Sequence, residues 1–151
     1  MQIEIRVHRK FSSRVQRARL ARIAQKTLRA DAARADVSLT LYITSDAEIR
    51  KLNRQFHATD TPTDVLSFPS SPLYPPDIGG QQGGYLGDII ISYERARVQA
   101  RAARWRIADE LDLLAVHGIL HLLGYDDLAP RARAKMWKRQ AEILGNVAGG
   151  E

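Results

Sequence analysis

The stretch IADELDLLAVHGILHLLGYDD, residues 107–127, decides how the rest of the chain folds. A helix through residues 107–123 carries apolar side chains on nearly every side, and a helix of that kind is buried. Gly124 follows directly, and glycine most readily takes the left-handed conformation that ends a helix. The sequence therefore predicts a central buried helix that ends in a sharp bend, with the other elements packed around it.

Two histidines of this helix, His117 and His121, are four residues apart. Side chains at this spacing lie on one helix face, about 6 Å apart at the Cβ atoms, so both imidazoles can reach one ion. Beyond the bend, Asp127 can turn back to supply a third ligand, and the adjacent Asp126 is an alternative. Three protein ligands with one open position are typical of catalytic zinc, so the sequence predicts one zinc ion held by His117, His121 and Asp127.

The alternative is a pair of core histidines whose ring nitrogens bond to backbone carbonyls or carboxylates. For a lone histidine that would be the better interpretation. Two neighbouring imidazoles, however, need partners for both nitrogens of both rings. Gly124 supplies a bend and Asp127 a third ligand. A metal site needs both and a plain core needs neither, so metal binding is favoured.

The same spacing matches the ligand frame of the metzincin proteases, H-E-x-x-H-x-x-G-x-x-H. Those enzymes carry a glutamate general base directly after the first histidine, whereas this chain has Gly118 there. The proton acceptor for peptide hydrolysis is therefore missing. A metalloprotease is the least favoured of the functions considered.

The flanking sequence predicts a sheet. Residues 2–8 and 37–43 alternate apolar and polar side chains, which is the period of a half-buried strand. A helix from about Ser13 to Ala30 connects them, so the two strands are expected to be parallel. Two further strands are predicted at residues 64–68 and 86–91.

Capping signals place the remaining helices. Ser45 opens a helix that ends near Phe56, Ser92 opens one that ends near Arg104, and Pro130 opens one that ends at Gly145. Two sets of side chains are expected to face the core from the first and last of these helices: Ile49, Leu52 and Phe56, and Trp137, Ala141 and Leu144.

Together these elements predict an α/β (α+β) fold with an about four-stranded, mostly parallel sheet and about five helices around the metal-bearing helix. No linker or repeat divides the chain, so residues 1–151 are expected to form a single domain. Residues 70–85, rich in glycine and proline, are predicted to be a flexible loop within it.

The basic residues gather at the two ends of the chain. The net charge of +6 divides into +8 for residues 1–35, −5 for residues 36–127 and +3 for residues 128–151. Four basic side chains recur at helical spacing in the first segment: Arg19, Arg22, Lys26 and Arg29. They predict a basic stripe that faces solvent, and the stripe is either a solvated surface or a phosphate-contacting one.

Several classes of protein are disfavoured by composition. The chain has no cysteine, so histidine and carboxylates remain as metal ligands. The longest apolar run, around residues 113–123, is too short to span a membrane. Residues 1–5 lack the basic start and apolar core of a secretion signal, so we expect a cytoplasmic protein with no membrane partner.

Three segments together resemble the YbeY family of bacterial ribosomal-RNA maturation factors. They are HGILHLLGYDD at 117–127, NRQFHATDTPTDVLSFP at 53–69 and LGDIIIS at 86–92, in the family's order and spacing. The resemblance covers residues 36–145. It implies a cytoplasmic, zinc-dependent, single-strand-specific endoribonuclease. It also implies a role in small-subunit ribosomal RNA processing and ribosome quality control, with RNA and components of the small ribosomal subunit as partners.

Two residues depart from the family's pattern. Asp127 replaces the third histidine, and a carboxylate oxygen is still a competent zinc ligand, although its charge makes the metal a weaker Lewis acid. His57 replaces an arginine that the resemblance places at the substrate phosphate, and Arg54 can reach the same place if the helix continues. His57 and Arg54 are therefore the candidate catalytic residues, with an exposed loop position as the alternative for His57.

The departures leave a second function open. A ribosome-associated RNA-binding factor would keep the fold and the metal but would have lost the cleavage activity along with the arginine. Asp88, a charged residue in an apolar strand, and Glu110, two turns before His117, are candidates to orient a ligand imidazole. An ion pair on the helix face is the alternative for Glu110.

Overall fold

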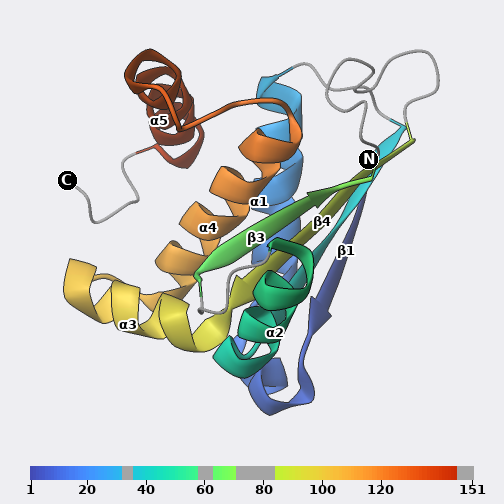
Figure 1. Ribbon diagram of the computed structural model, residues 1–151, viewed down its shortest axis with the longest axis vertical. Helices are drawn as coiled ribbons and strands as arrows, with labels where there is room; N and C mark the ends of the chain where they lie inside the picture. Colours follow the sequence, from blue (N-terminus) through green and yellow to red (C-terminus); the bar gives the residue numbers. More distant parts are fainter. Residues whose placement is uncertain (32–35, 58–62, 71–83, 146–151) are drawn as a thin grey trace.

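The computed structural model describes residues 1–31, 36–57, 63–70 and 84–145, which form a four-stranded sheet with helices on both faces (Figure 1). The strands lie in the order β1-β2-β4-β3. Their bounds are Gln2–Val7 for β1, Val37–Thr44 for β2, Val65–Pro69 for β3 and Gly84–Ser92 for β4. β1, β2 and β4 are parallel, and β3 runs antiparallel to β4 at the sheet edge. The predicted mostly parallel α/β sheet is confirmed.

The described residues contain five α-helices and one short 3-10 helix, η1. Their bounds are Arg9–Arg14 for η1, Arg17–Ala30 for α1, Asp46–His57 for α2, Tyr93–Ala103 for α3, Ile107–Leu122 for α4 and Pro130–Leu144 for α5. The start of the first predicted helix was wrong by several residues. Phe11 is buried in η1 and Val15 is extended, so the chain turns once before α1 begins.

Alternation along β4 divides the core between the two faces of the sheet. Ile89 and Ile91 belong to the main core together with Ile119 of α4. Ile90, between them, belongs to a smaller cluster on the other face with Ile49 of α2. The helices α1, α3 and α4 therefore cover one face, and α2 covers part of the other.

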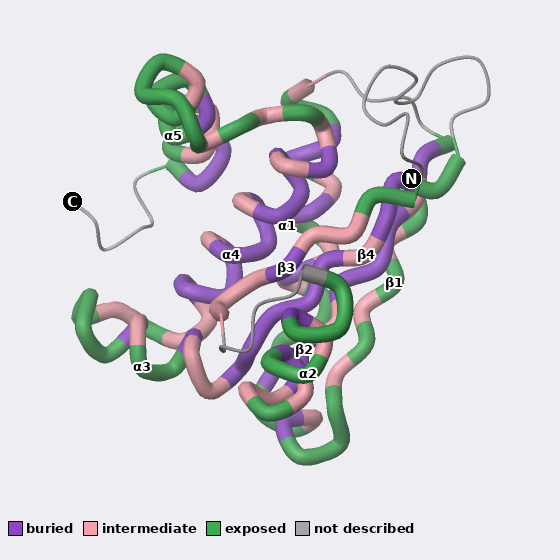
Figure 2. The backbone as a smooth tube through the Cα atoms, in the orientation of Figure 1, coloured by how far each residue is buried: buried purple, intermediate pink, exposed green. Residues whose placement is uncertain are grey.

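The helix α4 is the centre of the fold, as predicted. Figure 2 shows it buried along most of its length, and eleven of its 16 residues are buried. One side of α4 packs in the main core, and Val116 and Leu120 form a second cluster with Met136 and Ile143 of α5. The helix is thus held between the sheet and α5.

Three predicted core side chains are exposed instead. Phe56 is 59% exposed near the end of α2, and Trp137 is 58% exposed on α5. On α5, Ala141 is exposed as well, whereas Leu144 is buried as predicted. Met136 and Ile143, which were not predicted, complete the buried face. Helical periodicity alone placed the buried face of α5 about one residue away from its observed position. The reason is that apolar side chains lie on more than one side of this helix.

Most of the predicted loop at residues 70–85 lies outside the described residues. Its last two residues, Gly84 and Tyr85, belong to β4, which therefore begins earlier than predicted. Among the helices that the structure describes, none combines the length and the apolar character needed to cross a bilayer.

Candidate metal centre

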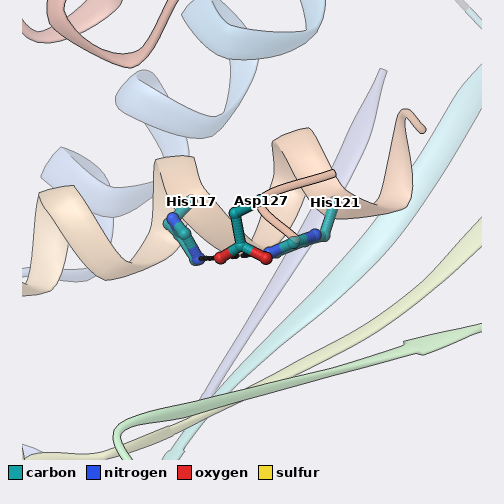
Figure 3. A group of neighbouring side chains, drawn as sticks. All are labelled: His117, His121 and Asp127. Carbon is teal, nitrogen blue, oxygen red and sulfur yellow. Dashed lines mark hydrogen bonds and ion pairs between the residues drawn. The ribbon is translucent and has the colours of Figure 1, made fainter. Parts of the chain in front are cut away.

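His117 and His121 lie one turn apart on α4, on a strip of the helix that is only partly covered. Their Nε2 atoms are 3.1 Å apart, and Oδ2 of Asp127 lies 3.6 Å from each of them (Figure 3). The three potential ligand atoms all lie within 4.8 Å of one another. The structure therefore brings together the three residues that the sequence singled out.

The bend after α4 returns the chain to this site. Gly124 has a φ of +102°, which favours glycine, and its N–H donates to the carbonyl of His121 at 3.0 Å. The turn carries Asp127 back over the helix. Asp126 is exposed, and its Oδ1 accepts a hydrogen bond from the Leu128 N–H at 2.9 Å. Of the two aspartates, Asp127 is the one that lies in the cluster.

The donor set fits a tetrahedral divalent cation. Imidazole nitrogens and a carboxylate oxygen are ordinary zinc ligands, and ligand atoms about 2.0–2.2 Å from such an ion lie roughly 3.3–3.6 Å from each other. The observed separations of 3.1 and 3.6 Å are close to this range. His117, His121 and Asp127 could therefore hold one ion with little rearrangement.

Each imidazole has a partner at its other nitrogen. Nδ1 of His117 lies 3.1 Å from Oε1 of Gln140, and Nδ1 of His121 lies 3.1 Å from the carbonyl oxygen of Tyr125. A carbonyl only accepts, so an Nδ1–H donates in each pair and leaves the Nε2 lone pair free for a metal. The sequence analysis missed Gln140, because no spacing rule links a glutamine on α5 to a histidine on α4.

The surroundings of His117 also favour a neutral ring. Burial lowers the pKa of His117, and the neighbouring His121 lowers it further, whereas the bond with Gln140 and the charge of Asp127 oppose the shift. A neutral imidazole is the form that binds a metal.

Gly118 explains the close approach of α4 to the sheet. A Cβ at this position would lie 2.6 Å from Cγ2 of Ile89, which is fully buried. The carbonyl of Gly118 accepts a hydrogen bond from the Ser67 hydroxyl of β3 at 3.2 Å. The metzincin glutamate therefore has no room here, which agrees with the low standing of the protease hypothesis.

An open cleft of about 480 Å³ lies in front of the cluster. Its described lining comprises Asp64, Val65, Leu66, Ser67, Pro69, His117, His121, Leu122 and Asp127. One wall is the edge strand β3 and the other is the end of α4. The three potential ligands thus face a space that a substrate can enter.

The structure does not place the candidate catalytic residues in this cleft. Arg54 is exposed on α2, and His57 is the last residue of that helix. The side chain of His57 lies outside the described part of the structure. Since α2 packs on the sheet face opposite α4, the role of both residues stays a prediction.

Asp88 and Glu110, the two acidic candidates for orienting a ligand imidazole, bond to other side chains. Asp88 accepts a hydrogen bond from the Tyr85 hydroxyl on the far face of β4. Glu110 is buried and accepts a hydrogen bond from Nε1 of Trp105 at 3.0 Å. In the described residues, the observed partners of the two histidine Nδ1 atoms are Gln140 and Tyr125 instead.

A family model and individual relatives of this chain all carry the same name. Residues 2–148 match the family described as Endoribonuclease YbeY. A protein named Endoribonuclease YbeY from Pelotomaculum thermopropionicum is 40% identical over 128 residues, covering 85% of this chain and 84% of the relative. Another of that name, from Dehalococcoides mccartyi strain CBDB1, is 40% identical over 159 residues and covers 97% and 93%.

A solved structure shares the fold. The solution structure of TM1509 from Thermotoga maritima matches with a TM-score of 0.64 and 29% sequence identity, covering 98% of this chain and 90% of that one. The family match spans nearly all of the chain, and the curated relatives are similar over most of their own length. The chain belongs to the Endoribonuclease YbeY family.

Proposed function

We propose that this protein is a zinc-dependent endoribonuclease that cleaves single-stranded RNA during maturation of the small-subunit ribosomal RNA and in ribosome quality control. The observation that carries the proposal is the convergence of His117, His121 and Asp127 at an open cleft. The names of the relatives support RNA as the substrate. We expect ribosomal RNA and small-subunit components as partners in the cytoplasm, and no membrane association.

In this proposal the bound ion and the residues around it have separate roles in cleavage. A bound zinc ion supplies a Lewis acid and a compact positive charge at the phosphodiester. His117 and His121 keep Nε2 available for the ion, because each donates from Nδ1 to a fixed acceptor. The cleft wall formed by β3 orients the RNA backbone, and Arg54 and His57 contact phosphate.

The experiment that tests the proposal measures bound zinc and RNA cleavage in the same samples. We expect His121→Ala and Asp127→Ala to lose zinc and to cleave single-stranded RNA at least about a hundredfold more slowly. Asp126→Ala is the matched control, since Asp126 lies outside the cluster, and it should keep both. Undiminished cleavage by His121→Ala would refute the proposal.

The same assay separates the enzyme from the RNA-binding factor. A binding factor would hold zinc and bind single-stranded RNA in the wild-type form, yet leave the RNA intact. Cleavage of single-stranded RNA, with a matched duplex left uncut, supports the endoribonuclease.

The contribution of α2 is tested separately. We expect Arg54→Gln and His57→Gln each to slow cleavage by about tenfold or more while bound zinc stays unchanged. Arg50→Gln, an exposed arginine one turn earlier on the same helix, is the control for a general loss of charge. Equal effects of Arg54→Gln and Arg50→Gln would remove Arg54 from the site.

A further inference from the structure

Both histidines of the metal centre are tied to the last helix, α5, which offers none of the three clustered ligand atoms. Two consecutive residues of α5 make these ties. Gln140 contacts His117 directly, and Arg139 reaches His121 through Tyr125. Their side chains are half-buried between α5 and the end of α4.

The first tie is a single hydrogen bond. Oε1 of Gln140 lies 3.1 Å from Nδ1 of His117. Because His117 projects from the partly covered strip of α4, its ring would otherwise be free to turn about its side-chain bonds. A fixed acceptor at Nδ1 holds the ring with Nε2 directed at the other two ligand atoms, where Figure 3 shows it.

The second tie runs through the bend after α4. The Tyr125 hydroxyl donates to Oδ1 of Asp31 at 3.0 Å and accepts from Nε of Arg139 at 3.3 Å. Arg139 also forms an ion pair with Asp31 at 3.3 Å. The side chain of Tyr125 is thus anchored between α1 and α5, and its backbone carbonyl is the acceptor for Nδ1 of His121.

We propose that α5 is the positioning element of the metal centre. Gln140 orients His117, and the Arg139–Tyr125–Asp31 network orients His121 and the bend that carries Asp127. This inference rests on the proposed metal site. It assigns a role to side chains that bind neither metal nor substrate, and outer partners of this kind change metal affinity by about 10–100-fold in other sites.

The test measures affinity for Co²⁺, with the visible absorption of bound Co²⁺ as the signal and a competing chelator to set the free concentration. Gln140→Met keeps the length of the side chain and removes the amide acceptor, and we expect it to weaken Co²⁺ binding by about 10–100-fold. Gln140→Glu keeps an acceptor and should bind at least as tightly as wild type. Lys138→Met, an exposed position on α5, is the control and should bind as wild type does.

The second tie is tested with Tyr125→Phe, which removes the hydroxyl but leaves the carbonyl that His121 uses. We expect a smaller loss, of a few-fold, because the carbonyl remains in place. The double variant with Gln140→Met should lose more affinity than either single variant, since the two contacts act on different rings. The melting temperatures of the metal-free variants, compared with wild type, separate loss of positioning from loss of fold.

These measurements distinguish failure of the positioning role from failure of the proposed RNA-cleaving activity. If Gln140→Met binds Co²⁺ as tightly as wild type, or if Gln140→Glu loses as much affinity as Gln140→Met, the positioning role is overturned while the metal site stands. If wild-type protein binds Co²⁺ with the expected dependence on Gln140 but leaves RNA intact, the positioning role stands and the proposed activity falls. A wild-type protein that binds no Co²⁺ overturns both.

Discussion

Gly118 sets how closely α4 approaches the sheet, and it should not tolerate a side chain. The added methyl group of Gly118→Ala would overlap Ile89, whose Cγ2 lies 2.6 Å from the ideal Cβ position. Overpacking of a core costs about 1–3 kcal/mol, against a gain of up to about 1 kcal/mol in helix propensity. We expect a net loss of about 1–2 kcal/mol in the free energy of unfolding, measured by urea denaturation.

The control is a double-mutant cycle with Ile89→Ala, which removes the overlapping atoms. Gly118→Ala should cost less in that background than in the wild type. If its cost is the same in both, the contact with Ile89 does not set the spacing.

Glu110 predicts a pH dependence of stability. Burial raises the pKa of Glu110 more than the hydrogen bond from Trp105 lowers it, and the charge of Asp64 raises it further. A carboxyl whose folded pKa is raised stabilises the fold fully below its unfolded pKa, and this stabilisation is lost as the pH rises through the folded pKa. The neutral, isosteric Glu110→Gln should therefore melt at a higher temperature than wild type at pH 7.

The advantage of Glu110→Gln should shrink as the pH falls toward and below the unfolded pKa of glutamate, about 4.3. Melting temperatures recorded between pH 4 and pH 8 measure this. A constant difference across that interval would mean that ionisation of Glu110 does not limit stability.

At the scale of elements, one arginine joins two helices. Arg19 of α1 donates to Asp109 at 2.8 Å and to Asp112 at 2.9 Å, and both carboxylates on α4 are buried. In Arg19→Met the buried Asp112 loses its ion-pair partner, whereas Asp109 keeps Arg106 at 3.4 Å. A buried charge left without its partner is strongly destabilising, so Arg19→Met should lower the free energy of unfolding by about 3 kcal/mol. Arg22→Met, on the exposed side of the same helix, should change it by less than about 0.5 kcal/mol. Chemical denaturation of the two variants makes the comparison, and similar losses would contradict it.

This ion pair also shows where element prediction stopped. Helical spacing grouped Arg19 with Arg22, Lys26 and Arg29 as a solvent-facing stripe, but the structure turns Arg19 toward α4. Periodicity finds the faces of a helix, and the identity of the neighbour decides whether a charge at the margin of a face is solvated or paired. The strands were predicted more accurately, because the period-2 alternation and the parallel crossover are set locally.

The same distinction holds for the candidate site. His117, His121 and Asp127 were predictable because four residues of helix and a glycine bend relate them within one segment. Gln140 and the Asp31–Tyr125–Arg139 network join α1, the bend and α5, and no local rule relates residues so far apart in sequence. Contacts of that kind appear only once the whole molecule is folded.

At the scale of the whole molecule, α5 carries exposed cationic and aromatic side chains next to the residue that contacts His117. Helical spacing puts Arg133 and Trp137 on the side of α5 that also carries Gln140, and both are exposed. An exposed tryptophan beside a cationic side chain is a platform on which single-stranded RNA can stack. A second group of exposed basic residues lies on α1, which packs against α4 and β1 and contributes none of the described lining residues of the cleft.

We therefore expect Trp137→Ala to weaken binding of single-stranded RNA by about tenfold, since stacking contributes about 1–3 kcal/mol per base. Arg133→Gln should reduce the slope of log affinity against log salt concentration by the equivalent of about one phosphate contact. The comparison is the triple variant Arg22→Gln, Lys26→Gln and Arg29→Gln, which removes more charge but should weaken binding only at low salt. Fluorescence anisotropy with a labelled oligonucleotide at several salt concentrations measures all three. If the triple variant weakens binding most at every salt concentration, RNA follows α1 rather than α5.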